Sequence, residues 1–235
     1  MCALQRNQLV WLREPAWQRI LWADWDAQAL AILSHWQRQQ LPWVVCRQRV
    51  PDRPDSISLG LPAPLQWERR KLAVEVAPAD IARAGSFPSL ADSVVAASHA
   101  AQVQDLLQHM DALQVQLQVY GSFGWQQICA LPCVRDSSDL DLLAHVPDLG
   151  TAGQVVWLLQ GLKLRWRVDG ELVFPNGWAL AWREYAQLIG GKVDRVLVKE
   201  RSSAQLRSMA ELRAELRGGR AVEAQAVPAV AAMQR

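Results

Sequence analysis

The sequence lacks the long apolar runs that membrane-spanning helices need. No stretch of its 235 residues reaches the roughly 18–20 consecutive apolar side chains that cross a bilayer. The first residues, MCALQRNQLVWLREP, also lack the basic start and short apolar core of a secretion signal. From the sequence we therefore expect no membrane partner and a cytoplasmic location.

Cysteine, histidine and net charge are scarce as well. The four cysteines give no disulfide framework, and the four histidines are scattered singly, without the spacing of a zinc site. The net charge of +2 comes from 25 basic and 23 acidic residues. Because a protein that coats nucleic acid is usually strongly basic, we expect no nucleic-acid partner.

What is present is enough apolar surface for a folded core. Apolar residues make up 51% of the chain and charged residues 20%, which excludes disorder for the bulk of it. Tryptophan is abundant, with 12 residues against 3 Phe and 2 Tyr. We interpret most of these indoles as fillers of the core and of a domain interface.

Hydrophobic periodicity and turn residues divide the chain into two units. Residues 1–86 form the first, 87–217 the second, and the Ala-rich tail 218–235 is predicted to be flexible. In the first unit we expect a helix within 25–40, strands over 43–50, 56–64 and 70–78, and a loop at 51–55. The sequence thus predicts a small N-terminal α+β domain.

The second unit reads as a mixed sheet with flanking helices. Its first half is expected to contain a helix over 90–112 capped by Ser89, a strand over 113–120, a short helix from 121 and a strand over 138–146. A helix over 151–162 follows, with Thr151 as a candidate cap, and then a hairpin turning at Asp169-Gly170 and a second turn at Asn176-Gly177. The unit ends with a strand over 194–200 and a helix over 202–216. The fold class is therefore α+β.

One short stretch of the second unit combines features that suit phosphate chemistry. A strand predicted to end at Tyr120 runs into Gly121 and Ser122, which open a helix. Glycine lets the backbone approach a ligand, and a helix N-terminus offers free N–H groups and partial positive charge. The Ser122 hydroxyl adds one donor. Alone, such a segment is most often only a turn and a cap.

Asp139 and Asp141 follow on the next predicted strand. Alternation places both carboxylates on one face, roughly 6–7 Å apart. Such a pair repels unless a cation lies between, and carboxylate oxygens suit Mg²⁺, which also takes phosphates and water. A solvated strand face explains an isolated pair equally well. The order of Gly-Ser, helix and Asp-x-Asp favours a site for Mg²⁺ and phosphate.

This order resembles the nucleotidyltransferase superfamily that includes DNA polymerase beta. The longer series YGSFGWQ, SSDLDLL, DGEL, AWREY and VLVK resembles more closely the phosphoribosyl-dephospho-CoA transferases, which are the holo-acyl-carrier-protein synthases of malonate decarboxylase. The N-terminal segments WVVCRQRV, ISLGLPAP and RRKLAVEV are similar to the first domain of that family. The resemblance covers about residues 5–205.

The resemblance implies a defined reaction. The family transfers 2′-(5″-phosphoribosyl)-3′-dephospho-CoA from its triphosphate precursor to a serine of an apo acyl carrier protein, and releases pyrophosphate. It implies that Asp139 and Asp141 hold Mg²⁺ against the triphosphate. One of these carboxylates, or a second metal, would help to deprotonate the serine. Gly121 and Ser122 would hold the outgoing phosphates.

Further candidates surround this core motif. Relatives in the superfamily often use a third carboxylate, for which Asp169 and Glu171 are both available, with a small preference for Asp169. A site with only two carboxylates stays open as well. Arg183 and Lys199 lie in segments that match the family pattern and are expected to bind substrate phosphates. For Trp125 and His145, which lie near the motif, we favour structural roles over substrate contact.

Two other interpretations remain open at the level of sequence. The same fold could transfer a nucleotide to another small-molecule or protein hydroxyl, or the chain could be a binding protein that has kept the fold. The complete Gly-Ser and Asp-x-Asp set speaks against the binding protein. A carrier protein is expected to be acidic, and a basic patch in the first unit could meet it: Arg47, Arg49, Arg53, Arg69, Arg70 and Lys71.

Overall fold

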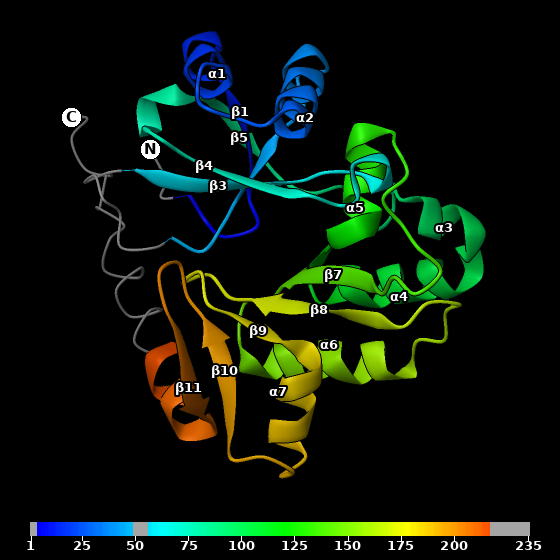
Figure 1. Ribbon diagram of the computed structural model, residues 1–235. Coiled ribbons are helices and arrows are strands. Elements are labelled where there is room, and N and C mark those ends of the chain that lie inside the picture. The colour runs from blue at the N-terminus through cyan, green and yellow to red at the C-terminus, as the bar shows by residue number, and fades with distance from the viewer. Residues whose placement is uncertain (1–3, 49–55, 217–235) are drawn as a thin grey trace, which may run out of the picture.

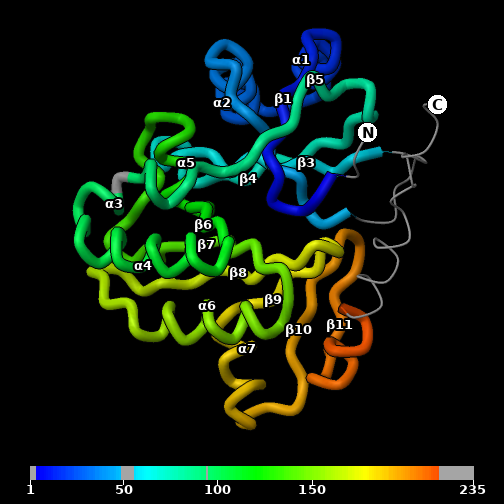
Figure 2. The backbone as a smooth tube through the Cα atoms, turned by 180° about the vertical axis from the view of Figure 1, so that it is seen from behind, coloured from blue at the N-terminus to red at the C-terminus, as the bar shows by residue number. Residues whose placement is uncertain are grey.

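The computed structural model describes residues 4–48 and 56–216, and the chain in it builds two sheets (Figure 1). The first sheet has the strand order β4-β3-β2-β1-β5 and the second the order β11-β10-β9-β8-β7-β6. Helices α1 and α2 lie on the outer side of the first sheet, and α6 and α7 on the outer side of the second (Figures 1 and 2). The α+β class predicted from the sequence is confirmed.

The first sheet is antiparallel throughout. The N-terminal elements are β1 (Leu9–Leu12), α1 (Glu14–Leu21), α2 (Ala27–Arg38), β2 (Trp43–Val45), β3 (Ile57–Pro62), the 3₁₀ turn η1 (Leu65–Trp67), β4 (Lys71–Val76), the 3₁₀ turn η2 (Pro78–Asp80) and β5 (Ile81–Gly85). Strand β1 and helix α1 were not predicted, because four and eight residues are too few to show a clear period.

Strand β2 is shorter than predicted and ends at Val45. Beyond that point the Cys46 N–H still donates to the Ser58 carbonyl at 3.1 Å, and the side chain of Gln48 adds to this bond. Its Nε2 donates to the carbonyl of Cys46 at 2.7 Å, and its Oε1 accepts from the backbone N–H of Ser58 at 2.8 Å. A side-chain amide thus extends the bonding between the two segments. Residues 49 and 50 of the predicted strand lie outside the described residues.

The second sheet is mixed, as predicted, because β7 and β8 are parallel while the other paired neighbours are antiparallel. The C-terminal elements are α3 (Val94–Ser98), α4 (Ala100–Ala112), β6 (Gln116–Val119), α5 (Gly121–Cys129), β7 (Leu140–His145), α6 (Leu149–Gly161), β8 (Val168–Val173), β9 (Ala179–Ala181), α7 (Trp182–Ile189), β10 (Arg195–Lys199) and β11 (Ala204–Ser208). Within the described ranges, no helix combines the length and apolar character required to cross a bilayer.

The predicted hairpin at Asp169-Gly170 is wrong. Both residues lie inside β8, where Asp169 is paired with Asp141 and Gly170 with Leu142. Gly170 has φ +132°, and a Cβ placed on it would lie 2.6 Å from the backbone nitrogen of Leu142. The glycine therefore serves the close approach of β7 rather than a turn. The turn at Gly177, whose N–H donates to Phe174 at 2.9 Å, is confirmed.

Three predicted helix boundaries also differ. The helix expected over 90–112 is split into α3 and α4, and its first cap is Ser93 rather than Ser89, which bridges to Gln118. Asp148 caps α6 by accepting from the backbone N–H of Thr151 at 2.8 Å. The segment 202–216 begins as β11, because pairing with β10 satisfies its backbone, and becomes helical only over 209–216.

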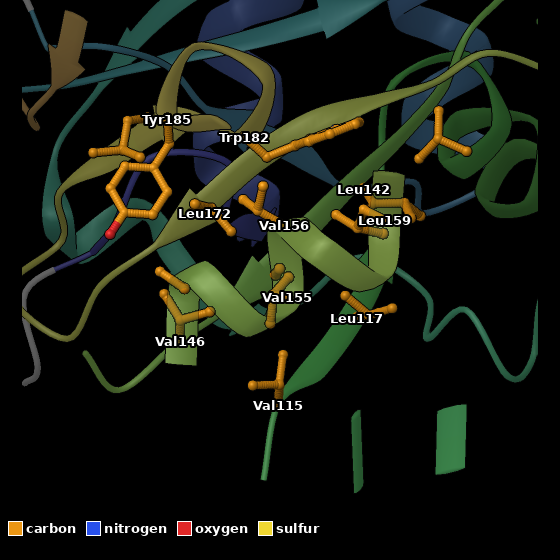
Figure 3. Close-up of a cluster of buried hydrophobic side chains, with 14 of the residues drawn as sticks. Val115, Leu117, Leu142, Val146, Val155, Val156, Leu159, Leu172, Trp182 and Tyr185 are labelled. Atoms are coloured by element: carbon orange, nitrogen blue, oxygen red, sulfur yellow. The ribbon is translucent and has the colours of Figure 1, made fainter. Parts of the chain in front are cut away.

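The two faces of the second sheet have different partners. Val155, Val156 and Leu159 of α6 lie among apolar strand residues of one face (Figure 3). On the other face, Leu143 of β7 and Val173 of β8 pack with the apolar core of the first sheet. Because side chains alternate along a strand, the odd-numbered residues of β7 and β8 face the N-terminal unit. The acidic residues of both strands have odd numbers.

Candidate active site

Asp139, Asp141 and Asp169 come together on the face of the second sheet that is turned towards the N-terminal unit. Asp141 and Asp169 are register partners on the parallel strands β7 and β8, and Asp139 lies one residue before β7. The Arg167 guanidinium joins two of them. It donates to both oxygens of Asp139, at 2.9 and 2.5 Å, and to Asp169 at 3.2 Å.

The surroundings shift the pKa values of Asp139 and Asp141 in opposite directions. Burial raises the pKa of Asp141 to about 6, and the carboxylates of Asp169, Asp139 and Glu171 add to the rise. The hydrogen bonds from Arg167 lower the pKa of Asp139. Asp141 therefore carries a negative charge at neutral pH only at a cost, which an added cation would relieve.

The donor set suits a hard divalent cation. Across residues 4–48 and 56–216, no group of three or more His, Cys, Asp or Glu side chains is placed to hold a metal ion. Mg²⁺ does not require three protein ligands, since it typically uses one or two protein carboxylates and fills its other positions with water and phosphates. Asp139 and Asp141, with Asp169 beside them, fit that requirement.

The Gly-Ser helix start lies directly against this cluster. Helix α5 begins at Gly121, as predicted, with a φ of +59°. A Cβ at Gly121 would overlap the Asp141 carboxylate and lie 2.9 Å from its Cγ. The backbone N–H of Tyr120 donates to the Asp141 carbonyl at 3.0 Å. The N-terminal N–H groups of α5 and the carboxylates thus border one space, and glycine is required between them.

Arg69 reaches this helix start from the N-terminal unit. Its Nη2 lies 3.3 Å from the Ser122 Oγ. The residue has a left-handed backbone, with φ +58°, as has Glu68 before it, with φ +55°. Sequence reasoning placed Arg69 in a carrier-binding patch, because no local signal shows that the η1–β4 loop folds over α5.

The other arginines of the expected basic patch do not share the position of Arg69. Arg70 turns away from the site and pairs with Asp26 at 2.5 Å and with Gln28 at 3.1 Å. Arg47 is exposed. Arg49 and Arg53 lie outside the described residues.

Glu171, the alternative third carboxylate, already has three side-chain hydrogen-bond donors, two of them from the N-terminal unit. It is 4% exposed. It accepts from Arg6, from Asn7 at 3.2 Å and from the Lys199 Nζ at 2.7 Å. Lys199, which the sequence places at the substrate, is therefore held by Glu171. Arg6 and Asn7 were missed, since they lie outside every motif.

Arg183, in the first turn of α7, donates to the backbone of β8. Its Nε and Nη2 donate to the Val168 carbonyl at 3.2 and 2.6 Å, and its guanidinium stacks 4.5 Å from the Trp182 ring centroid. The charge of Arg183 also contributes to the lowered pKa of Asp139. Trp125 is buried edge-on against Phe87, at 5.5 Å between centroids, which confirms its interpretation as a core residue.

Replacing Glu171 by glutamine is expected to destabilise the folded protein by about 3 kcal/mol, since a buried pair that loses one partner leaves its cations uncompensated. Urea unfolding of the two proteins measures the difference. Glu75→Gln, the same change on an exposed position of β4, is the control and should shift stability by less than about 0.5 kcal/mol. Equal shifts in the two variants would contradict a joining role for Glu171.

Comparison with known proteins assigns both units to one family. Residues 5–87 match the family model for the phosphoribosyl-dephospho-CoA transferase MdcG N-terminal domain, and residues 89–210 match that for its C-terminal domain. No solved structure matches the chain.

Curated relatives cover nearly the same span. A phosphoribosyl-dephospho-CoA transferase of Xanthomonas euvesicatoria pv. vesicatoria is 38% identical over 218 residues, 88% of this chain and 95% of the relative. One of Bradyrhizobium diazoefficiens is 28% identical over 206 residues, 83% of this chain and 90% of the relative. The family models and these relatives agree, and the chain belongs to the phosphoribosyl-dephospho-CoA transferase family.

Proposed function

We propose that this transferase moves 2′-(5″-phosphoribosyl)-3′-dephospho-CoA from its triphosphate precursor to a serine of the apo acyl carrier protein of malonate decarboxylase. The observation that carries the proposal is the contact between two elements. The N-terminus of α5, at Gly121, lies against the Asp141 carboxylate, and Asp141 is the register partner of Asp169. Family membership supplies the substrate class.

In this proposal Asp139 and Asp141 hold Mg²⁺, and Asp169 is the third carboxylate because Glu171 is already bound by Arg6 and Lys199. When bound, the metal would neutralise negative charge that develops on the transferred phosphate and on the leaving pyrophosphate. Ser122 and the first N–H groups of α5 bind the outgoing phosphates. Arg69, beside the Ser122 hydroxyl, adds a guanidinium to the same place.

The chemical step is a substitution at phosphorus. The serine oxygen of the carrier forms a bond to the phosphorus nearest the ribose, and the bond from that phosphorus to pyrophosphate breaks. The proton of the serine hydroxyl passes to a carboxylate, for which we propose Asp169. It is 29% exposed at its side chain, so an incoming hydroxyl can reach it, and it has only a single contact with Arg167, at 3.2 Å.

A carrier-loading experiment tests this function. The protein, Mg²⁺, the triphosphate precursor and the apo carrier subunit of malonate decarboxylase are mixed, and the carrier is weighed by intact mass spectrometry. We expect a gain of one phosphoribosyl-dephospho-CoA unit, absent without Mg²⁺ and absent with Asp139→Asn. Asp136→Asn, an exposed aspartate before the site, is the matched control and should load normally.

Other outcomes of that experiment decide against the proposal. If the carrier gains no mass while another nucleoside triphosphate is converted to pyrophosphate, the site transfers a nucleotide to a different hydroxyl. If loading proceeds equally well with Asp139→Asn, the Asp-x-Asp pair does not hold the metal.

A further inference from the structure

A polar pocket opens on the α6 and α7 side of the second sheet, next to the Arg167 side chain that pairs with the carboxylates, and the proposed function leaves it unused. It lies between the end of α6, the segment that leads into β8, and α7 with the turn that follows it, and it has a volume of about 410 Å³. That volume falls within the range of small-molecule sites. Its polar and aromatic lining comes from seven side chains: Gln160, Trp166, Arg167, Trp182, Arg183, Gln187 and Lys192.

The charge of this lining has one sign. Arg167, Arg183 and Lys192 all border the pocket, and no Asp or Glu is among the described residues that line it. Arg183 is held in place by its bonds to the Val168 carbonyl. Lys192 forms no ion pair with any residue of the described ranges, so its charge is available to a ligand.

Arg167 connects the pocket with the carboxylates. Its guanidinium pairs with Asp139 and Asp169, and the same side chain forms part of the pocket wall. A ligand in the pocket would therefore lie one side chain away from the site of phosphate transfer.

Trp182 adds an unpaired donor. The residue is 3% exposed, and its indole Nε1–H has no hydrogen-bond partner among the residues that the structure describes. Buried donors are almost always paired, so this one calls for an acceptor from outside the described chain. Trp182 belongs to the pocket wall, where a ligand oxygen or water would be near.

We propose that this pocket binds the diphosphate ester in the dephospho-CoA half of the substrate. The inference rests on the proposed function. The substrate carries two anionic groups, the triphosphate and the diphosphate that links adenosine to the pantetheine arm. The α5 start follows β6, whereas Arg167 precedes β8, and β7 with its carboxylates lies between them. The two anionic groups thus have cationic sites on opposite sides of the reacting centre.

The test uses dephospho-CoA alone as the probe, because it has the diphosphate ester and lacks the triphosphate. Isothermal titration of the full chain compares Lys192→Gln with Lys163→Gln, which removes the same charge nearby but does not line this pocket. We expect Lys192→Gln to weaken dephospho-CoA binding about threefold to fivefold, the scale of an ionic contact made by a solvent-exposed lysine. Pyrophosphate affinity should be unchanged in both variants.

Three results would overturn the pocket assignment: no binding of dephospho-CoA to the unmodified protein, equal effects of the two lysine variants, or an equal loss of pyrophosphate affinity with Lys192→Gln. The carrier-loading experiment distinguishes a failure of the pocket assignment from a failure of the proposed function. Loading by a protein whose KM for the precursor does not respond to Lys192→Gln rejects the pocket alone. A failure to load with selective loss of dephospho-CoA binding rejects the carrier reaction alone.

Discussion

Asp141→Asn is expected to abolish carrier loading and, at the same time, to make the folded protein more stable. The loss of activity should exceed about 10³-fold, because in the proposed function Asp141 holds the metal, and charge stabilisation is a large part of phosphoryl transfer. The gain in stability follows from the same position. Asparagine has nearly the shape of aspartate but no charge that burial would penalise.

The sign of the pH dependence follows from the pKa of Asp141, which the fold raises from 3.8 to about 6. At about pH 3 and below, the group is protonated in most molecules of both the folded and the unfolded chain and has little effect. As the pH rises from about 4 to 6, the unfolded chain loses the proton first, so the folded state loses stability. A shift of this size corresponds to about 3 kcal/mol, which partial solvent exposure reduces to about 1–2 kcal/mol.

Thermal unfolding of the unmodified protein and of Asp141→Asn at pH 3 and pH 8 measures this effect. The variant should unfold at a higher temperature at pH 8 and at nearly the same temperature at pH 3. Adding Mg²⁺ at pH 8 should raise the unfolding temperature of the unmodified protein but not that of the variant. A variant that is less stable than the unmodified protein at pH 8 would contradict the assigned burial of charge.

Gly121→Ala is the second change with a large expected effect. The residue needs glycine for two reasons, its φ of +59° and the Asp141 carboxylate that a Cβ would overlap. A left-handed backbone costs about 1–2 kcal/mol for a residue with a Cβ, and overpacking adds about 1–3 kcal/mol. We expect urea unfolding to show a loss of about 3 kcal/mol, and the loading rate to fall by about 10²-fold, the scale expected for a 1 Å misplacement.

Gly191→Ala separates these two causes. Gly191 has almost the same backbone conformation, with φ +65°, but no atom lies within 4 Å of a Cβ built there. This control should lose about 1 kcal/mol and load the carrier at the normal rate. If the two alanine variants lose equal stability and both keep their activity, Gly121 serves only its turn and not the approach of α5 to Asp141.

The sequence by itself determined those features that depend on neighbouring residues. The two-residue alternation in SDLDLL placed Asp139 and Asp141 on one face, and a glycine after an alternating strand placed the start of α5 at Gly121. Both features are local, because strand alternation and helix initiation are set by residues within a few positions of each other. The family motifs lie in these same segments.

Only the tertiary structure decided the role of Gly170. Asp-Gly is a common turn dipeptide, and the local signal for a hairpin is genuine. Gly170 lies in a strand because Leu142, 28 positions away in the chain, packs its backbone against the glycine. A local pattern contains no information about that approach.

The tertiary structure likewise decided which candidate carboxylate and which cations are available to a substrate. Glu171 is bound by Arg6, 165 positions away, which leaves Asp169 beside the Asp-x-Asp pair. Arg69 reaches Ser122 across 53 positions, whereas its neighbour Arg70 pairs with Asp26. The sequence shows which charges exist, but their pairing depends on how the two sheets pack, since a charge interacts with whatever the fold brings within a few ångströms.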